Sequence, residues 1–174
     1  MDIALTDNAE TVHDKLMLLG ADLVVRTCRD IVAGEVHPIP QSQLTVDGPL
    51  RPAPKIFKET CRIEWGSHSL KSAYDFIRGL SPYPGAWTTL VDYDGNESVV
   101  KVFETQMVES SETVLESDLE PGLFPIETDG RTYLGITVPG GVLRILSLQL
   151  AGKRRMSVDE FLRGVHLDKY QGWR

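Results

Sequence analysis

Apolar residues recur at spacings of three and four between residues 12 and 31, which places them on one side of a helix. Gly34 lies where the C-terminus of such a helix is expected. Gly20 interrupts the pattern, so we predict a helical hairpin within residues 1–36. Because helices of this length are marginal alone in water, the apolar side must pack on something. Residues 1–50 contain almost nothing to cover it.

Residues 37–58 follow as a proline-rich linker, with five prolines in seventeen residues at positions 38, 40, 49, 52 and 54. Proline fixes φ and lacks a donor, so an extended connection is expected here. We therefore divide the chain into residues 1–36, the linker 37–58 and a C-terminal domain over residues 59–174.

Two further helices are predicted in the C-terminal domain. The first covers about Leu70–Arg78, with Ser67 or Ser69 as its cap and Gly79 as its end. The second begins after Ser157, which is followed by acidic residues in the first turn, and ends at Gly164.

Between these helices the pattern is typical of strands, rich in β-branched and aromatic residues. Turn signals at Asp94-Gly95, Asp129-Gly130 and Gly140-Gly141 join neighbouring stretches into hairpins. The expected strands are Trp87–Val91, Ser98–Met107, Gly122–Thr128, Thr132–Val138 and Val142–Leu150. Five antiparallel strands with a helix after them predict an α+β, mainly β fold built on a five-stranded barrel like that of oligonucleotide-binding proteins.

Composition supports a folded chain outside the membrane. The 174 residues are 41% hydrophobic and 25% charged, a balance typical of globular proteins. No apolar run approaches the roughly 18 residues of a membrane span, and the N-terminus lacks the features of a signal peptide. Cys28 and Cys61 each stand alone, so we expect reduced thiols, no metal site and a cytoplasmic location.

The net charge of −7 argues against a polyanion-binding protein only as an average. Residues 92–130 carry one basic and eleven acidic groups, a net of −10. Residues 55–91 carry five basic and three acidic groups, and residues 131–174 carry eight and three. One acidic segment thus separates two basic ones.

Candidate catalytic chemistry is absent from these patterns. His13, His37, His68 and His166 have no local signature of a nucleophile, a base or a metal site. The glycines spell no phosphate-binding loop. The basic groups Lys55, Lys58 and Arg62 near the linker, and Lys153, Arg154 and Arg155 after the last strand, suit phosphate contact. A solubilising loop explains the second group equally well.

Three segments resemble methionyl-tRNA formyltransferases. Residues 55–65, KIFKETCRIEW, are similar to that family's linker and first strand, and residues 77–87, IRGLSPYPGAW, to its turn into the C-terminal barrel. Residues 146–156, LSLQLAGKRRM, are similar to its last strand and basic loop. Residues 11–21 resemble the final helices of its formyltransferase domain.

The resemblance implies that this chain corresponds to a C-terminal portion. The family's larger Rossmann-like N-terminal domain binds the formyl donor 10-formyltetrahydrofolate and supplies the catalytic asparagine, histidine and aspartate. No segment of this chain matches those motifs, so the resemblance assigns it no catalytic and no cofactor-binding residue. It implies that residues 1–36 are the end of a truncated formyltransferase domain, whose sheet would cover the apolar helix side.

The resemblance also implies a role in binding initiator methionyl-tRNA for translation initiation. That role is assigned to Lys55, Lys58, Lys153, Arg154 and Arg155, while Arg62 joins them only as a nearby cation. The acidic segment 92–130 must then turn away from the tRNA. We expect a monomer that transfers no formyl group by itself. A non-catalytic nucleic-acid-binding module, or part of a formyltransferase acting on another amine such as that of a nucleotide sugar, remains an alternative.

Overall fold

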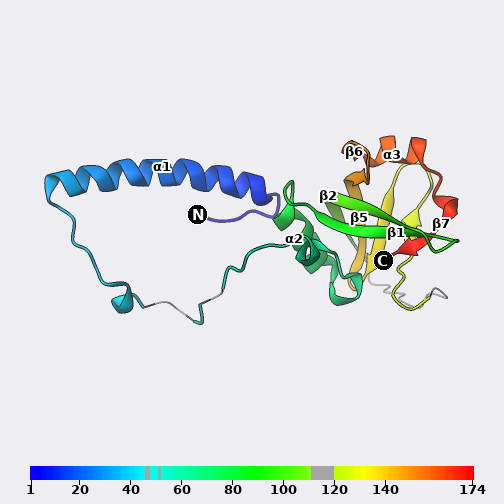
Figure 1. The fold of residues 1–174 in the computed structure, drawn as a ribbon, viewed down its shortest axis with the longest axis horizontal. Coiled ribbons are helices and arrows are strands. Elements are labelled where there is room, and N and C mark those ends of the chain that lie inside the picture. The colour runs from blue at the N-terminus through cyan, green and yellow to red at the C-terminus, as the bar shows by residue number, and fades with distance from the viewer. Residues whose placement is uncertain (46–47, 51, 111–119) are drawn as a thin grey trace. The chain divides into compact units, whose positions relative to one another are not determined.

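The computed structural model describes residues 1–45, 48–50, 52–110 and 120–174. The chain forms two compact units, one made of Met1–Glu10 with Phe57–Arg174 and the other of Thr11–Ile56. Three α-helices occur in the described residues: α1 (Ala9–Ala33), α2 (Leu70–Leu80) and α3 (Val158–Gly164) (Figure 1). Short 3-10 helices lie at Gln41–Gln43, Glu59–Cys61, Trp65–Ser67 and Leu167–Lys169.

The helix α1 is continuous, so the prediction of a helical hairpin is wrong. Gly20 lies inside it, and a Cβ placed there would meet no atom within 4 Å. A glycine within a helix costs only about 1 kcal/mol relative to alanine, which does not end a helix that is otherwise well formed. None of the 25 residues of α1 is buried, and its apolar side chains are exposed, among them Leu16, Leu19 and Leu23.

The unit that contains Phe57–Arg174 is built on one antiparallel sheet of seven strands. Their bounds are β1 (Ala86–Asp92), β2 (Glu97–Glu109), β3 (Ile126–Thr128), β4 (Leu134–Val138), β5 (Gly141–Leu150), β6 (Met156–Ser157) and β7 (Tyr170–Trp173). The strand order is β3-β4-β5-β2-β1-β7, and β6 pairs with β5. The predicted hairpin turns are present, and at Gly141 a Cβ would lie 2.1 Å from the carbonyl oxygen of Val108.

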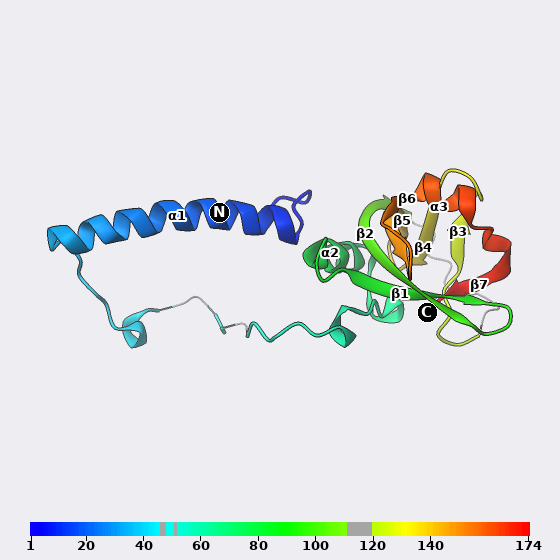
Figure 2. The same cartoon turned by 45° about the horizontal axis from the view of Figure 1, so that its top comes forward.

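The sheet curls until its two edges meet. Phe124, just ahead of β3, and Trp173 of β7 exchange backbone hydrogen bonds of 2.8 Å in both directions. Figure 2 shows that β3 and β7 lie near each other where the sheet closes. The result is a nearly closed barrel. Predicted strands correspond to β1–β5, although β3 is shorter than expected. The five-stranded count is wrong, because β6 and β7 also join the sheet.

The barrel core is apolar and closed at one end by α2, which packs against β2 and β5. Trp65 is fully buried, and its indole Nε1 donates to Thr88 Oγ1 at 2.8 Å. Ser69 and Ser157 begin α2 and α3 with reciprocal capping boxes, as predicted from their sequence positions. The helix α2 continues through Gly79 to Leu80.

The first residues of the chain belong to the barrel unit. The hydroxyl of Tyr74 donates to the carbonyl of Leu5 at 2.9 Å. Arg78 Nη1 donates to the carbonyls of Ala4 and Asp7 at 3.0 and 2.7 Å. The helix α2 therefore holds the segment that leads into α1.

Both cysteines are free thiols, with Cys61 buried and Cys28 exposed. Across the described ranges, no three His, Cys, Asp or Glu side chains gather as a metal site. None of the helices described by the structure is long and apolar enough to cross a membrane.

Candidate nucleic-acid interface

Lys58, at the end of the predicted linker, and Arg62 are both attached to Trp87 of β1. The carbonyl of Lys58 accepts a hydrogen bond of 2.8 Å from Trp87 Nε1. The guanidinium of Arg62 lies 5.6 Å from the centre of the same indole ring, within the range of a cation–π contact. The backbone N–H of Ile63 donates to the carbonyl of Trp87 at 2.8 Å. Lys58 and Arg62 are therefore fixed on Trp87 from opposite ends of the Glu59–Cys61 turn.

Arg62 is only partly available to a ligand. Its Nε is buried and has no hydrogen-bond partner among the described residues, since Glu64 Oε1 lies 3.6 Å away, within ion-pair range but too far for a hydrogen bond. Its side chain is 36% exposed. Lys58 is exposed. Of the two, Lys58 presents the freer charge.

The predicted basic loop lies in the turn between β5 and β6. Gln149 Nε2 donates to the carbonyl of Lys153 at 2.7 Å. Within the described chain, the ammonium of Lys153 makes no hydrogen bond or ion pair. Arg154 is 72% exposed and donates from Nη2 to Glu160 Oε1 at 2.8 Å. That hydrogen bond, with a smaller effect from the Ser157 backbone, lowers the pKa of Glu160.

Arg155 differs from its two neighbours because it is bound to the barrel. Its Nε donates to Ser147 Oγ at 2.8 Å, its Nη2 pairs with Glu104, and its guanidinium lies 4.5 Å from the ring centre of Phe103. These contacts occupy much of its hydrogen-bonding capacity. The structure thus presents Lys153 and Arg154 outward and uses Arg155 to fasten their loop.

The contact with Glu104 also bears on the expectation about the acidic segment. Glu104 lies within residues 92–130 yet pairs with Arg155, so at this position the acidic segment lies beside a residue predicted to bind tRNA. β2 carries Glu104 to β5, where it is in register with Ser147. Glu112, Glu116 and Asp118 of the same segment lie outside the described residues.

A row of three paired residues connects the two basic groups across the sheet. Trp87 of β1 is in register with Lys101 of β2, and Lys101 is in register with Gln149 of β5. Paired residues project from the same face of a sheet, and two strand spacings separate Trp87 from Gln149 by about 10 Å. Their neighbours Val100, Val102 and Leu148 are buried in the core, so this cross-strand row faces outward. Lys58 and Arg62 adjoin one end of the row, and Lys153 adjoins the other.

Sequence reasoning missed Lys101, the central residue of this row. Its Nζ donates to the carbonyl of Pro84 at 2.8 Å, and its side chain is half-buried. Lys101 is the single basic residue within the acidic segment 92–130. The net charge of that segment is strongly negative, so the segment total gave no indication of this cation. Strand alternation offered a signal, because Lys101 stands between two valines that face the core.

Lys55 and two of the histidines considered in the sequence have the following surroundings. Lys55 belongs to the Thr11–Ile56 unit. His13 is exposed and lies 3.2 Å from Asp14. His68 contacts Ser72 at 3.2 Å, and burial lowers its pKa although Glu64 acts in the other direction.

Known proteins similar to this chain are formyltransferases. Residues 55–166 match the family described as "Formyl transferase, C-terminal domain". The chain is 54% identical over 165 residues to methionyl-tRNA formyltransferase of Bacteroides fragilis, and 52% identical over 165 residues to that of Bacteroides thetaiotaomicron. Each alignment covers 95% of this chain but only 48% and 49% of the relative. The chain therefore spans about half the length of the curated relatives it matches.

Solved structures show the same fold at lower identity. A variant of HypX from Aquifex aeolicus aligns over 95% of this chain and 28% of its own, with a TM-score of 0.54 and 19% identity. A second HypX variant aligns over 87% of this chain and 24% of its own, with a TM-score of 0.52. The fold, the family match over residues 55–166 and the close relatives agree, and this chain belongs to the formyltransferase C-terminal domain family, where it corresponds to the C-terminal part of methionyl-tRNA formyltransferases.

Proposed function

We propose that this chain is the tRNA-binding part of a methionyl-tRNA formyltransferase acting in translation initiation in the cytoplasm. The observation that carries the proposal is the cross-strand row, which joins two basic groups from distant parts of the sequence on one outer face of the barrel. The close relatives named methionyl-tRNA formyltransferase support tRNA as the nucleic acid.

The proposed contacts are electrostatic. Lys58, Lys101, Lys153 and Arg154 would neutralise backbone phosphates, while Arg155 would keep the loop in place. Such contacts hold and orient a nucleic acid without reading its sequence. Recognition of the initiator tRNA and of its methionyl group would then depend on other parts of the whole enzyme. Lys55 remains a prediction in the same role.

Formyl transfer itself is proposed for the whole protein and not for these 174 residues. In that reaction the methionyl amine would attack the formyl carbon of 10-formyltetrahydrofolate, and the oxyanion that develops would need donors placed around it. The bond from the formyl carbon to N10 would then break, the amine would lose a proton, and tetrahydrofolate would leave. The present residues supply a surface that positions the tRNA. We expect the purified chain to bind tRNA and to transfer no formyl group.

The experiment measures both properties on the 174-residue chain. Binding of labelled initiator tRNA is followed by fluorescence anisotropy, and formylation is followed with 10-formyltetrahydrofolate and methionyl-tRNA. Replacing Lys58 and Lys153 together by Gln should weaken binding about tenfold or more at low salt, whereas replacing Lys71 and Arg131 together by Gln should not. Equal losses of affinity in the two double variants would contradict the proposed interface. Formyl transfer by the wild-type chain would contradict the proposal that this chain binds tRNA without catalysing the reaction.

A further inference from the structure

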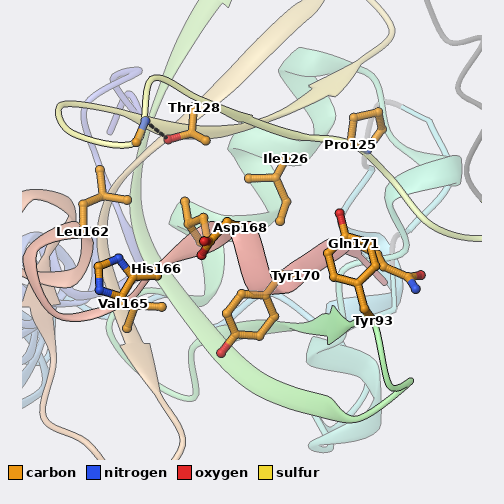
Figure 3. Close-up of a pocket in the computed structure, with 12 residues that line it drawn as sticks. Tyr93, Pro125, Ile126, Thr128, Leu162, Val165, His166, Asp168, Tyr170 and Gln171 are labelled. Atoms are coloured by element: carbon orange, nitrogen blue, oxygen red, sulfur yellow. Dashed lines mark hydrogen bonds between the residues drawn. The ribbon is translucent and has the colours of Figure 1, made fainter.

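A cavity of about 600 Å³ lies between the end of α3, the Leu167–Lys169 turn, β7 and β3. Figure 3 shows the side chains that surround it. Ile126, Leu162 and Val165 give it an apolar lining. No residue of the cross-strand row lines it.

Most polar side chains around this cavity bond to no other residue among those that the structure describes. Tyr93, His166, Asp168, Tyr170 and Gln171 all line it, and none of these side chains makes a hydrogen bond or ion pair with the residues that the structure describes. Thr128 is the contrasting case, since its hydroxyl donates to the carbonyl of Tyr133 at 2.6 Å and accepts from the N–H of Gly130 at 2.9 Å. Tyr93, His166 and Asp168 are exposed, so solvent reaches these polar groups and a ligand that enters the apolar hollow can replace that water.

The composition of the lining favours a planar ring. An apolar cavity with a few convergent polar groups is the common form of a small-ligand site. The rings of Tyr93 and Tyr170 offer stacking surfaces, and unpaired bases in RNA are held by stacking and by hydrogen bonds to their Watson–Crick edges. No Lys or Arg lines the cavity, while Asp168 contributes a carboxylate, so a phosphate group does not fit inside.

The carboxylate of Asp168 selects among the bases. It has two acceptor oxygens and, when ionised, no donor. Guanine presents two adjacent donors, N1–H and the N2 amino group, on its Watson–Crick edge. On the Watson–Crick edges of the other three bases, adenine, cytosine and uracil, an acceptor lies next to a donor. That acceptor would face an oxygen of the carboxylate, and no hydrogen bond could form between them. We propose that this cavity binds the guanine base of a nucleotide, with Asp168 accepting hydrogen bonds from N1–H and from the N2 amino group.

Cations next to the lining suit the rest of such a nucleotide. Lys169 follows Asp168 and Arg163 follows Leu162 in the sequence, and both are exposed. They can approach the phosphate outside the cavity while the base lies within it. The guanine can come from a free guanosine nucleotide or from an unpaired guanosine in RNA, because the base chemistry is the same in both.

The first test titrates the 174-residue chain with GMP, AMP, CMP, UMP and IMP, observed by amide NMR and calorimetry. GMP should bind most tightly and shift the amides of residues 166–171. IMP lacks the N2 amino group and should bind about tenfold more weakly, because only one of the two hydrogen bonds to Asp168 would remain. Equal affinity for all five nucleotides, or no shift at residues 166–171 at millimolar GMP, would overturn the proposal.

Variants separate the base contact from general effects of charge. Asp168→Asn replaces one acceptor by a donor and should reduce GMP affinity at least tenfold. Asp159→Asn removes an exposed carboxylate in the first turn of α3, outside the cavity, and should leave GMP affinity unchanged. Tyr93→Leu removes one stacking surface and should weaken all nucleotides together. Wild-type GMP affinity in Asp168→Asn would overturn the assignment of that residue.

The last arm identifies the source of the base. The pentanucleotide UUGUU should bind more tightly than both GMP and UUAUU if the base comes from RNA, and GMP should bind more tightly if it comes from a free nucleotide. Neither result depends on the cross-strand row. A chain that binds GMP but not tRNA would contradict the proposed function and support this site. A chain that binds tRNA but not GMP would support the proposed function and overturn this site.

Discussion

Arg155 donates from Nε to Ser147 Oγ over 2.8 Å, and this hydrogen bond fastens the basic loop to β5. The same guanidinium pairs with Glu104 of β2 and lies over the ring of Phe103. Arg155 therefore connects β2 and β5, although the sequence groups it with the cations Lys153 and Arg154. Its neighbours Lys153 and Arg154 keep their charges in solvent.

Arg155→Ala should therefore destabilise the protein, whereas Lys153→Ala should not. Loss of a charged hydrogen bond that leaves a partner unsatisfied costs about 2 kcal/mol. An exposed side chain without partners changes stability by about 0.5 kcal/mol or less. Urea unfolding of the two variants measures the difference. Similar midpoints for both would show that Arg155 does not anchor the loop.

Trp173 should contribute much of the stability of barrel closure. It is fully buried, and its Nε1 donates to the carbonyl of Gly135 at 3.3 Å. Trp173→Ala should lower the free energy of unfolding by about 3–5 kcal/mol, the usual range for a buried aromatic residue. Tyr83→Ala is the matched control, since Tyr83 is 84% exposed. A small effect at Trp173 would mean that β7 is not required to close the sheet.

These residues also show how far the sequence predicts the fold. β1, β2, β4 and β5 follow from alternation and turn signals, which are local properties. β7 does not, because Tyr170-Gln171-Gly172-Trp173 is short and contains a glycine. Its place is fixed by pairing with β1, about 80 residues away, as in the hydrogen bond of 2.9 Å from the Thr89 N–H to the carbonyl of Arg174.

The candidate interface was also predictable only in part, because local patterns are visible in the sequence but contacts between distant residues are not. Clusters such as residues 153–155 are visible in the sequence, but their division into outward and anchoring cations depends on Glu104 and Ser147. Lys101 joins the interface only through strand register. The error at Gly20 has a different origin, since a single glycine weakens a helix without determining where it ends.

Arg78 should hold the first residues of the chain on α2. It donates to the carbonyls of Ala4 and Asp7 and also, through Nε, to Asp75 Oδ1 at 2.7 Å. Arg78→Met should raise amide hydrogen exchange at residues 4–7 about tenfold or more, because charged hydrogen bonds contribute about 1.5–3 kcal/mol. Lys71→Met removes the other cation paired with Asp75 and should leave that exchange unchanged. Unchanged exchange in Arg78→Met would contradict the anchor.

Asp129 should give the β3–β4 turn a dependence on pH. The Thr132 hydroxyl, and then the backbone N–H groups of Thr132 and Arg131, hold the pKa of Asp129 well below its ordinary value of about 3.9. A carboxyl whose folded pKa is lowered contributes stability above its unfolded pKa and loses it as pH falls through the folded value. Asp129→Asn should therefore flatten the fall in Tm below about pH 4. A carboxyl NMR titration of Asp129 with a midpoint near 3.9 would contradict this prediction.

The most direct test of the proposed interface is the salt dependence of tRNA binding. Neutralising roughly three to five phosphates should give a slope of log affinity against log salt of about −2 to −4 for the wild-type chain. Replacing Lys58, Lys101 and Lys153 by Gln should reduce that slope by roughly 2–3, about one for each phosphate that is no longer neutralised. The control replaces Arg26, Lys71 and Arg131 by Gln, removes the same charge and should keep the wild-type slope. Equal slopes for the two triple variants would contradict the account that the cross-strand row is the tRNA-binding face.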